Sequence, residues 1–253
     1  YLSTEYLGIL IDTNFDAAAK SPLRNRLIRQ AISYGFDRVK MMRYLRNNIG
    51  KPGLAGFVPA GIPWFGQEKV EGYNYNPAKA MQLLEKAGYP GARGLPPITL
   101  TTNASYLDLC RYIQSQLGEI GINVKIDVTP PATLREMIAQ SKVSFFRGSW
   151  IADYPDAENY LSLFYSPNFC PVGPNYTHFK SSVFDKLYNE STRETNDSLR
   201  GLTYMQMDSL LMQEAPVIIL YYDEVLRFTR KNISGLGSNP LNLLTLKQVK
   251  KAK

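Results

Sequence analysis

The chain has 253 residues, with 29 basic and 22 acidic side chains and a net charge of +7. Because 44% of the residues are hydrophobic, 12% are aromatic and only 20% are charged, the composition excludes a wholly disordered chain and indicates a folded protein with a substantial core. The longest apolar runs, such as 216–222, are too short for a membrane-spanning helix, which needs ~20 residues.

The amino-terminal part of the chain is predicted to contain a strand, a helix and a long loop. Apolar residues 7–12 indicate the strand, and Pro22 is a favourable first residue for the helix. The core-facing positions of this helix are Ile28, Ala31, Ile32 and Phe36. The arginines at its other positions are expected to be solvated: Arg24, Arg26, Arg29 and Arg38. The loop, residues 50–66, is rich in glycine and proline, and Trp64 near its end is expected to cover the core, with a ligand-binding platform as the alternative.

A second helix is clearly delimited by its flanking residues. Asn76 is a suitable N-cap and Pro77 a suitable first residue, while Gly88 can take the left-handed conformation that ends a helix. Its predicted buried stripe consists of Ala80, Met81, Leu84 and Ala87.

Alternating strands and helices follow. Residues 98–102 and 122–128 indicate strands on either side of a helix over 105–120. Such a unit almost always crosses over right-handed, which makes its two strands parallel. A helix over 130–140 and a strand over 143–150 continue the pattern, which predicts an α/β layered domain.

The remainder is predicted to be mainly helical, with one more strand. A short helix over 157–164 lies in a loop-rich region, and further helices cover 182–192 and the residues after the N-cap Asn196. Apolar residues 217–222 indicate a strand, and after Phe228 the periodic pattern is lost.

Thiol and imidazole groups are scarce. Cys110, Cys170 and His178 together cannot supply a four-ligand zinc site, and no metal or cofactor is predicted. Two buried free thiols are the expected state. A disulfide, a catalytic thiol with His178 as its base, and a nickel or haem ligand at His178 remain alternatives.

The carboxylates Asp153, Asp156 and Glu158 cluster in a predicted loop. Two carboxylates can serve glycoside hydrolysis, but the same residue types also cap helices and shape turns. No nucleotide-binding glycine pattern follows a strand, and the basic residues are spread over several helices rather than gathered in one stripe. These features favour neither an enzyme nor a nucleic-acid-binding protein.

Several segments, in order along the chain, together carry a family resemblance. Residues 27–38 contain Arg-Gln-Ala and end in Asp-Arg, and residues 75–89 read Tyr-Asn-Pro-x-x-Ala, then Leu-Leu, then Ala-Gly. Residues 150–156, Trp-Ile-Ala-Asp-Tyr-Pro-Asp, are the most specific match. Asn-Tyr at 175–176, Phe-Asp-Lys-Leu at 184–187 and Glu-Ala-Pro at 214–216 follow. The chain thereby resembles the extracytoplasmic solute-binding proteins of ABC transporters, in the peptide and nickel branch (family 5).

The resemblance implies an α/β fold that is one lobe of a periplasmic-binding-protein-like (type II) clamshell, with a mixed sheet flanked by helices. Residues 1–228 would be the second, carboxyl-terminal lobe, and residues 229–253 would pack on a first lobe that precedes Tyr1. The sequence begins without an initiator methionine or a signal peptide, which is expected of a piece of a longer protein.

The resemblance also implies a ligand site. Asp153 would be the counter-ion for the α-ammonium of a peptide, because a carboxylate in a closed cleft forms strong charge-assisted hydrogen bonds. Arg147, six residues earlier, would receive the peptide carboxylate, with a structural salt bridge as its alternative role. Trp150 and Tyr154 would form apolar walls, and Asn175 and His178 would lie at the cleft rim.

The implied function is reversible capture of peptides, or of similar small solutes, for an ABC importer, without catalysis. The implied partners are the solute, the membrane permease subunits and the first lobe of the same polypeptide, but no nucleic acid. The location would be periplasmic or extracytoplasmic, with a lipid anchor as a further option. A ligand-sensing domain of a bacterial transcription regulator, a nickel or other solute binder, and an enzyme that uses Asp153 and Asp156 remain alternatives.

Overall fold

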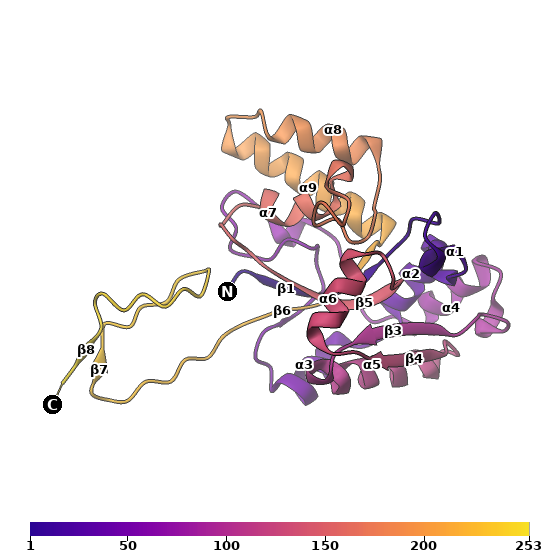
Figure 1. The fold of residues 1–253 in the computed structure, drawn as a ribbon, viewed down its shortest axis with the longest axis horizontal. Helices are drawn as coiled ribbons and strands as arrows, with labels where there is room; N and C mark the ends of the chain where they lie inside the picture. The colour runs from indigo at the N-terminus through magenta and orange to yellow at the C-terminus, as the bar shows by residue number, and fades with distance from the viewer. Residues whose placement is uncertain (253) are drawn as a thin grey trace.

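A mixed β-sheet forms the centre of the structure, a computed structural model that describes residues 1–252 (Figure 1). Within these residues the main sheet has six strands in the order β2-β6-β1-β5-β3-β4. The strands are β1 (Ser3–Ile9), β2 (Lys51–Pro52), β3 (Ile98–Thr102), β4 (Val124–Val128), β5 (Phe145–Ile151) and β6 (Val217–Tyr222).

Because of the strand directions, several strands end on the same side of the sheet. β1 pairs antiparallel with both β5 and β6, and β3 pairs parallel with β4 and β5. The carboxyl ends of β3, β4, β5 and β6 therefore lie at one edge of the sheet, next to the amino end of β1. We call this the carboxyl edge.

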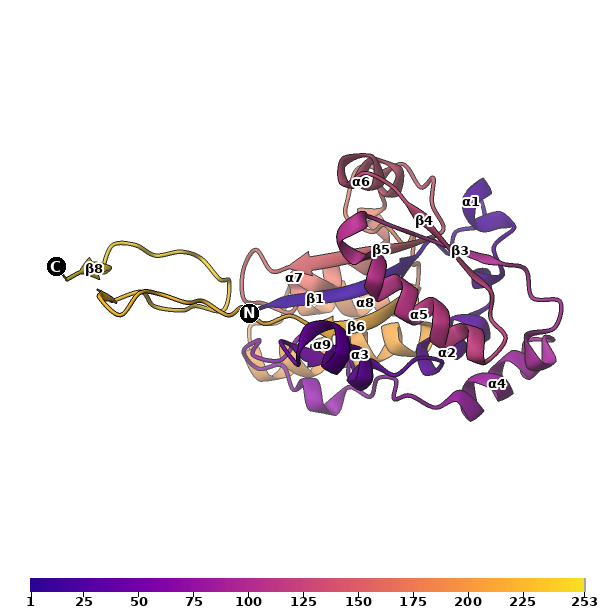
Figure 2. The same ribbon diagram turned by 90° about the horizontal axis from the view of Figure 1, so that it is seen from below.

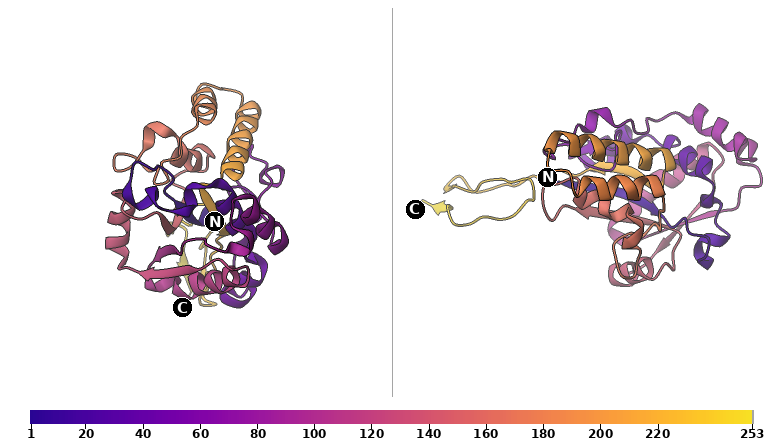
Figure 3. Two further views of the ribbon diagram at one scale, coloured as in Figure 1. Left: turned by 90° about the vertical axis from the view of Figure 1, so that its right-hand side faces the viewer. Right: turned by 90° about the horizontal axis from the view of Figure 1, so that it is seen from above.

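Helices cover both faces of the sheet (Figures 1 and 2). One face carries α2 (Arg26–Tyr34), α3 (Arg38–Arg46), α4 (Pro77–Lys86) and α5 (Leu107–Glu119). The other carries α6 (Pro131–Ala139), α7 (Glu158–Leu161), α8 (Ser182–Ser191) and α9 (Asp197–Glu214), of which α8 and α9 lie side by side (Figure 3). A short helix, α1 (Asp16–Ala19), follows β1. Each face has its own hydrophobic core, and the mixed sheet flanked by helices confirms the predicted fold class.

The last part of the chain leaves the lobe. After β6, residues 223–252 extend away as an arm that contains a short hairpin of β7 (Ile233–Ser234) and β8 (Lys250–Lys251) (Figure 1). The arm exposes large apolar side chains: Val225, Leu226, Phe228, Leu243, Leu244 and Leu246. The predicted loss of periodicity after Phe228 agrees with this irregular course.

The β-α-β prediction is confirmed, but the first strand and the first helix differ from expectation. β1 begins at Ser3 because polar Ser3, Thr4 and Glu5 are buried between β5 and β6, where the Thr4 hydroxyl donates to the carbonyl of Phe57 at 2.9 Å. The predicted helix stops at Tyr34, and a separate helix, α3, begins after the N-cap Asp37.

Some side chains also lie where the sequence did not place them. Arg29 and Arg38 are buried rather than solvated, because their guanidinium groups donate to backbone carbonyls. Met81 is exposed, since the buried face of α4 is narrower than predicted and consists of Ala80 and Leu84. Trp64 does not cover the core: its φ is 61° and its side chain is exposed, while Phe65 is buried instead.

Asp208 on α9 is a fully buried carboxylate that holds the loop directly after β2. It accepts hydrogen bonds from the backbone of Phe57 at 2.7 Å and of Val58 at 3.1 Å. Burial raises its pKa from 3.8 to about 7, and the two N–H donors oppose this shift. Since the folded state then holds a proton that the unfolded state releases, the free energy of unfolding should fall as the pH rises from about 4 to 7.

We expect Asp208→Asn to flatten this pH dependence, by up to about 4 kcal/mol across the interval. Urea unfolding at several pH values would measure the difference between the variant and the wild type. Asp108→Asn is the control, because the Asp108 side chain is 85% exposed. Parallel profiles for the wild type and Asp208→Asn would contradict the assignment.

Candidate functional site

Three of the predicted site residues lie together at the carboxyl edge: Trp150 is near the end of β5, and Asp153 and Tyr154 follow directly after this strand. Arg147 lies earlier in β5, with its side chain on the opposite face of the sheet from Trp150. Gly148 does not break the strand, which continues to Ile151. In open α/β sheets, ligands bind in the crevice outside the carboxyl ends of the strands, so this placement suits a binding site.

The Asp153 carboxylate is available to a ligand. Asp153 is exposed, and none of the ion pairs formed within residues 1–252 includes it. Within the described residues, its carboxylate accepts one hydrogen bond, a long one from the Asn159 amide at 3.4 Å. A carboxylate without a resident cation can bind a cationic group of a ligand.

Asn159 is a site residue that the sequence reasoning missed. It is buried in α7, and its Oδ1 accepts hydrogen bonds from Trp150 Nε1 at 2.9 Å and from the Asp153 backbone at 3.2 Å. With the bond to the Asp153 carboxylate, it fixes both the indole and the loop that carries Asp153. The sequence gives only a weak signal, an asparagine next to apolar residues in a short helix.

The other two carboxylates of the cluster have structural roles. Asp156 accepts a hydrogen bond from the backbone of Glu158 at 2.9 Å and pairs with Arg200 at 3.3 Å. Glu158 accepts hydrogen bonds from the hydroxyls of Tyr154 and Tyr188. The hydrogen bond from the Glu158 backbone gives Asp156 the turn role named as an alternative, and the other contacts are side-chain pairs. Asp153 is thereby left without a free carboxylate partner within the cluster.

Arg147 is buried on the face of the sheet that packs against α5. Its guanidinium pairs with Glu5 of the neighbouring strand and lies 3.2 Å from the ring centroid of Tyr106. Burial lowers its pKa to about 10, which leaves the group charged at neutral pH. The salt bridge foreseen as the alternative role is therefore present, while Nε of Arg147 is buried without a hydrogen-bond partner.

Asn175 and His178 do not join this group. Asn175 is fully buried, and its amide is used within its own loop, where Nδ2 donates to Tyr165 and Phe179 and Oδ1 accepts from Thr177. His178 contacts Asp12, which follows the carboxyl end of β1 at the opposite edge of the sheet. Both residues are therefore left out of the candidate site.

At that opposite edge, Cys170 and His178 come together. Cys170 Sγ lies 3.2 Å from His178 Nε2, and His178 Nδ1 lies 3.3 Å from Asp12 Oδ2. This is the order of a nucleophile, a base and an orienting carboxylate, but the thiol is buried and burial raises its pKa. Cys110 is buried in the other core, where burial raises its pKa to about 11. Both cysteines are free, so the disulfide alternative is wrong.

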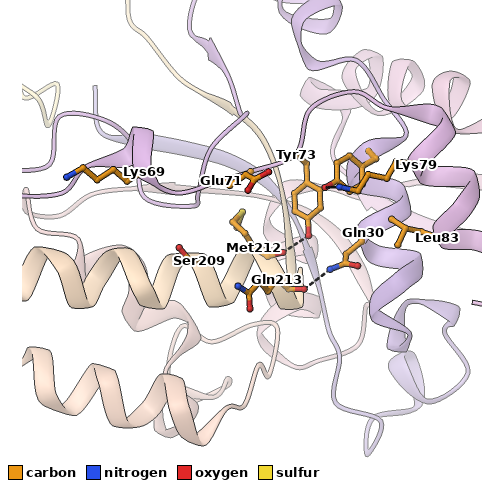
Figure 4. A pocket seen from close by; sticks show the side chains of 11 residues that line it. Gln30, Lys69, Glu71, Tyr73, Lys79, Leu83, Ser209, Met212 and Gln213 are labelled. Carbon is orange, nitrogen blue, oxygen red and sulfur yellow. Dashed lines mark hydrogen bonds between the residues drawn. The ribbon is translucent and has the colours of Figure 1, made fainter. Parts of the chain in front are cut away.

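A cavity adjoins the site residues at the carboxyl edge, and a larger one lies apart from them. The larger, about 510 Å³, lies between α2, α4 and α9 and contains none of the predicted residues (Figure 4). Its walls are held together by hydrogen bonds from Gln30 to Gln213 and from Tyr73 to Met212. The smaller, about 260 Å³, adjoins the carboxyl edge and is lined by Arg147 and Trp150, among others.

Among the described residues, the carboxyl-terminal half of β5 has a strand neighbour on only one side. β3 pairs with β5 only between Thr101 and Phe146, so residues 147–151 have β1 on one side and, within residues 1–252, no strand on the other. An open strand edge can bind an extended peptide through main-chain hydrogen bonds.

Residues 1–252 contain no group of three or more His, Cys, Asp or Glu side chains arranged to hold a metal ion. None of the helices in this range combines the length and the hydropathy needed to cross a bilayer.

The structure is thus an α/β lobe with an open strand edge and an unpaired carboxylate at its carboxyl edge. Residues 1–169 match the family model described as bacterial extracellular solute-binding proteins, family 5 (middle). The chain belongs to this family.

Curated relatives and solved structures agree with this membership. The chain is 27% identical to the dipeptide-binding protein DppE of Bacillus subtilis over 234 residues, which are 89% of this chain and 42% of the relative. It is 26% identical to the oligopeptide-binding protein OppA of the same species, over 88% of this chain and 41% of that protein. The fold matches the Escherichia coli murein tripeptide binding protein MppA with a TM-score of 0.83 and 22% identity, over 100% of this chain and 48% of that one. The chain thus spans less than half the length of these proteins.

Proposed function

We propose that this chain is the second lobe of the substrate-binding component of an ABC importer, which captures peptides between two lobes. The observation that carries the proposal is the open edge of β5 leading to the unpaired carboxylate of Asp153. The names of the relatives, which include dipeptide- and oligopeptide-binding proteins, support peptides as the solute.

In the proposed complex, the peptide backbone lies along residues 147–151 as an added strand. Its α-ammonium binds Asp153, and its carboxyl end points toward Arg147, up to ~20 Å away along an extended chain. Trp150, half-buried, and Tyr154, 47% exposed, would form walls beside the peptide. Main-chain contacts would let the site accept varied side chains.

The rest of the molecule would serve closure and transport. Residues 1–228 would form the lobe, and the apolar side chains of the arm would pack on the first lobe, which explains why Phe228 is 89% exposed here. Closure of the two lobes would exclude water and create the form that the permease subunits bind. The family is extracellular by description, and a lipid anchor in the full-length protein belongs to this proposal.

The test is Asp153→Asn in the complete two-lobe protein, with peptide affinity measured by calorimetry. Removing one partner of a buried charge pair typically costs about 2–5 kcal/mol, so tripeptide affinity should fall by at least about 30-fold. An N-acetylated tripeptide lacks the ammonium and should bind the wild type and the variant equally weakly. Unchanged affinity of Asp153→Asn for the free-amino tripeptide would contradict the proposal.

A further inference from the structure

The smaller cavity at the carboxyl edge lies between α6 and the open edge of β5. Asn103, which follows β3, and Pro131, the first residue of α6, line it and place it at the carboxyl edge. Leu134, Ile138 and Phe146 supply an apolar interior. A side chain of a peptide bound along β5 would be next to this cavity.

The polar groups of this cavity are mainly hydrogen-bond donors and cations. Arg135 on α6 takes part in none of the ion pairs formed within residues 1–252. Tyr6, 4% exposed, and Asn103 add a hydroxyl and an amide to the lining.

No acidic side chain balances these donors in the lining. The side chain of Arg147 points to the opposite face of the sheet, where it pairs with Glu5, so Arg135 is the uncompensated cation of the cavity. A cavity of about 260 Å³ with an apolar interior and free donors is suited to a group that combines methylenes with acceptor oxygens.

We propose that this cavity is a specificity pocket for an acidic side chain of the bound peptide, and that Arg135 is the residue that selects it. Glutamate fits better than aspartate, because its longer stem can contact Leu134 and Ile138 while the carboxylate reaches Arg135. Glutamine has the same shape without the charge, so it keeps the packing and loses the charge-assisted hydrogen bonds. This inference rests on the proposed peptide-binding function.

The test compares the affinities of isosteric peptides for the complete two-lobe protein by calorimetry. The peptides are Glu-Ala-Ala, Ala-Glu-Ala and Ala-Ala-Glu, each paired with its glutamine counterpart. At one position we expect the glutamate peptide to bind at least about 10-fold more tightly than the glutamine peptide. Arg135→Gln should abolish this difference, whereas the control Arg111→Gln, at a side chain 63% exposed on α5, should preserve it.

The outcomes separate this inference from the function on which it rests. Tight binding of all peptides without a glutamate preference, or a preference that persists in Arg135→Gln, would overturn the specificity pocket and leave the proposed function intact. If amidation of the peptide carboxyl terminus abolishes binding and the side-chain exchanges have no effect, the cavity holds the main-chain carboxylate, which also overturns the inference. Failure of every peptide to bind would overturn the proposed function itself and the pocket with it.

Discussion

Replacing Arg38 with alanine is expected to lower the free energy of unfolding by about 3 kcal/mol or more. The side chain is 1% exposed, and its Nε donates to the carbonyl of Ile219 in β6 at 2.5 Å. Nη1 donates to the carbonyl of Ser33 at 2.8 Å, and the guanidinium lies 4.2 Å from the ring centroid of Phe36. The substitution would leave buried carbonyls without donors and open a cavity between α2, α3 and the sheet.

The buried guanidinium of Arg38 keeps its charge. Burial lowers the pKa of Arg38 to about 9, so the group stays protonated at neutral pH although it forms no ion pair within residues 1–252. Backbone carbonyl dipoles and the aromatic ring therefore stabilise the cation in place of a carboxylate. Arg38→Lys should recover only part of the stability, because an ammonium group does not reproduce the planar geometry of the guanidinium.

Chemical unfolding of the purified variants would measure these differences. Arg43→Ala is the matched control, since Arg43 is an exposed arginine on the same helix and should change stability by about 0.5 kcal/mol or less. If Arg38→Ala lowers the free energy of unfolding no more than Arg43→Ala does, the contacts of Arg38 with the backbone carbonyls do not stabilise the fold.

Replacing Asn159 with alanine is expected to weaken peptide binding by about 10-fold to 100-fold, although Asn159 is not proposed to touch the ligand. The variant loses the acceptor for Trp150 Nε1 and for the Asp153 backbone, and the donor to the Asp153 carboxylate. Trp150 and Asp153 would then sample several orientations, and part of the binding energy would be spent on ordering them. Asn159 is thus a positioning residue.

A double-mutant cycle distinguishes positioning from general destabilisation. If Asn159 acts through Asp153, adding Asn159→Ala to Asp153→Asn should cost much less affinity than it does in the wild type. Asn168→Ala is the control, because Asn168 donates to Ser162 in the same region without contacting Asp153. Equal losses in both backgrounds, or a loss matched by Asn168→Ala, would show that Asn159 has no specific link to Asp153.

Much of the local structure was predictable from short-range rules. Asn76 caps α4 as expected, Gly88 takes a positive φ of 89°, and β3 was placed at its observed bounds. The parallel pairing of β3 with β4 was predicted from the strand–helix–strand order, since such units cross over right-handed. These features depend on residues close together in the sequence, where capping, backbone preference and apolar periodicity act directly.

The candidate site was predictable only in part. The segment that holds Trp150, Asp153 and Tyr154 was identified from its resemblance to a family, and the structure places it at the carboxyl edge. The sequence could not reveal that Asn159 links Trp150 to Asp153, or that Asn175 has no free polar group. Each of these facts depends on which hydrogen bonds are satisfied after folding.

The sequence by itself determined the order of helices and strands, the α/β class and the family resemblance. These depend on local patterns and on short motifs that can be recognised in the linear sequence. Only the tertiary structure decided that Arg29 and Arg38 are buried, that Glu5 pairs with Arg147, and that the edge of β5 is open beside a donor-lined cavity. These groups are brought together by segments as far apart as Glu5 and Arg147 or Arg38 and Ile219. Whether a polar side chain is solvated or buried is determined by the partners that such distant segments provide.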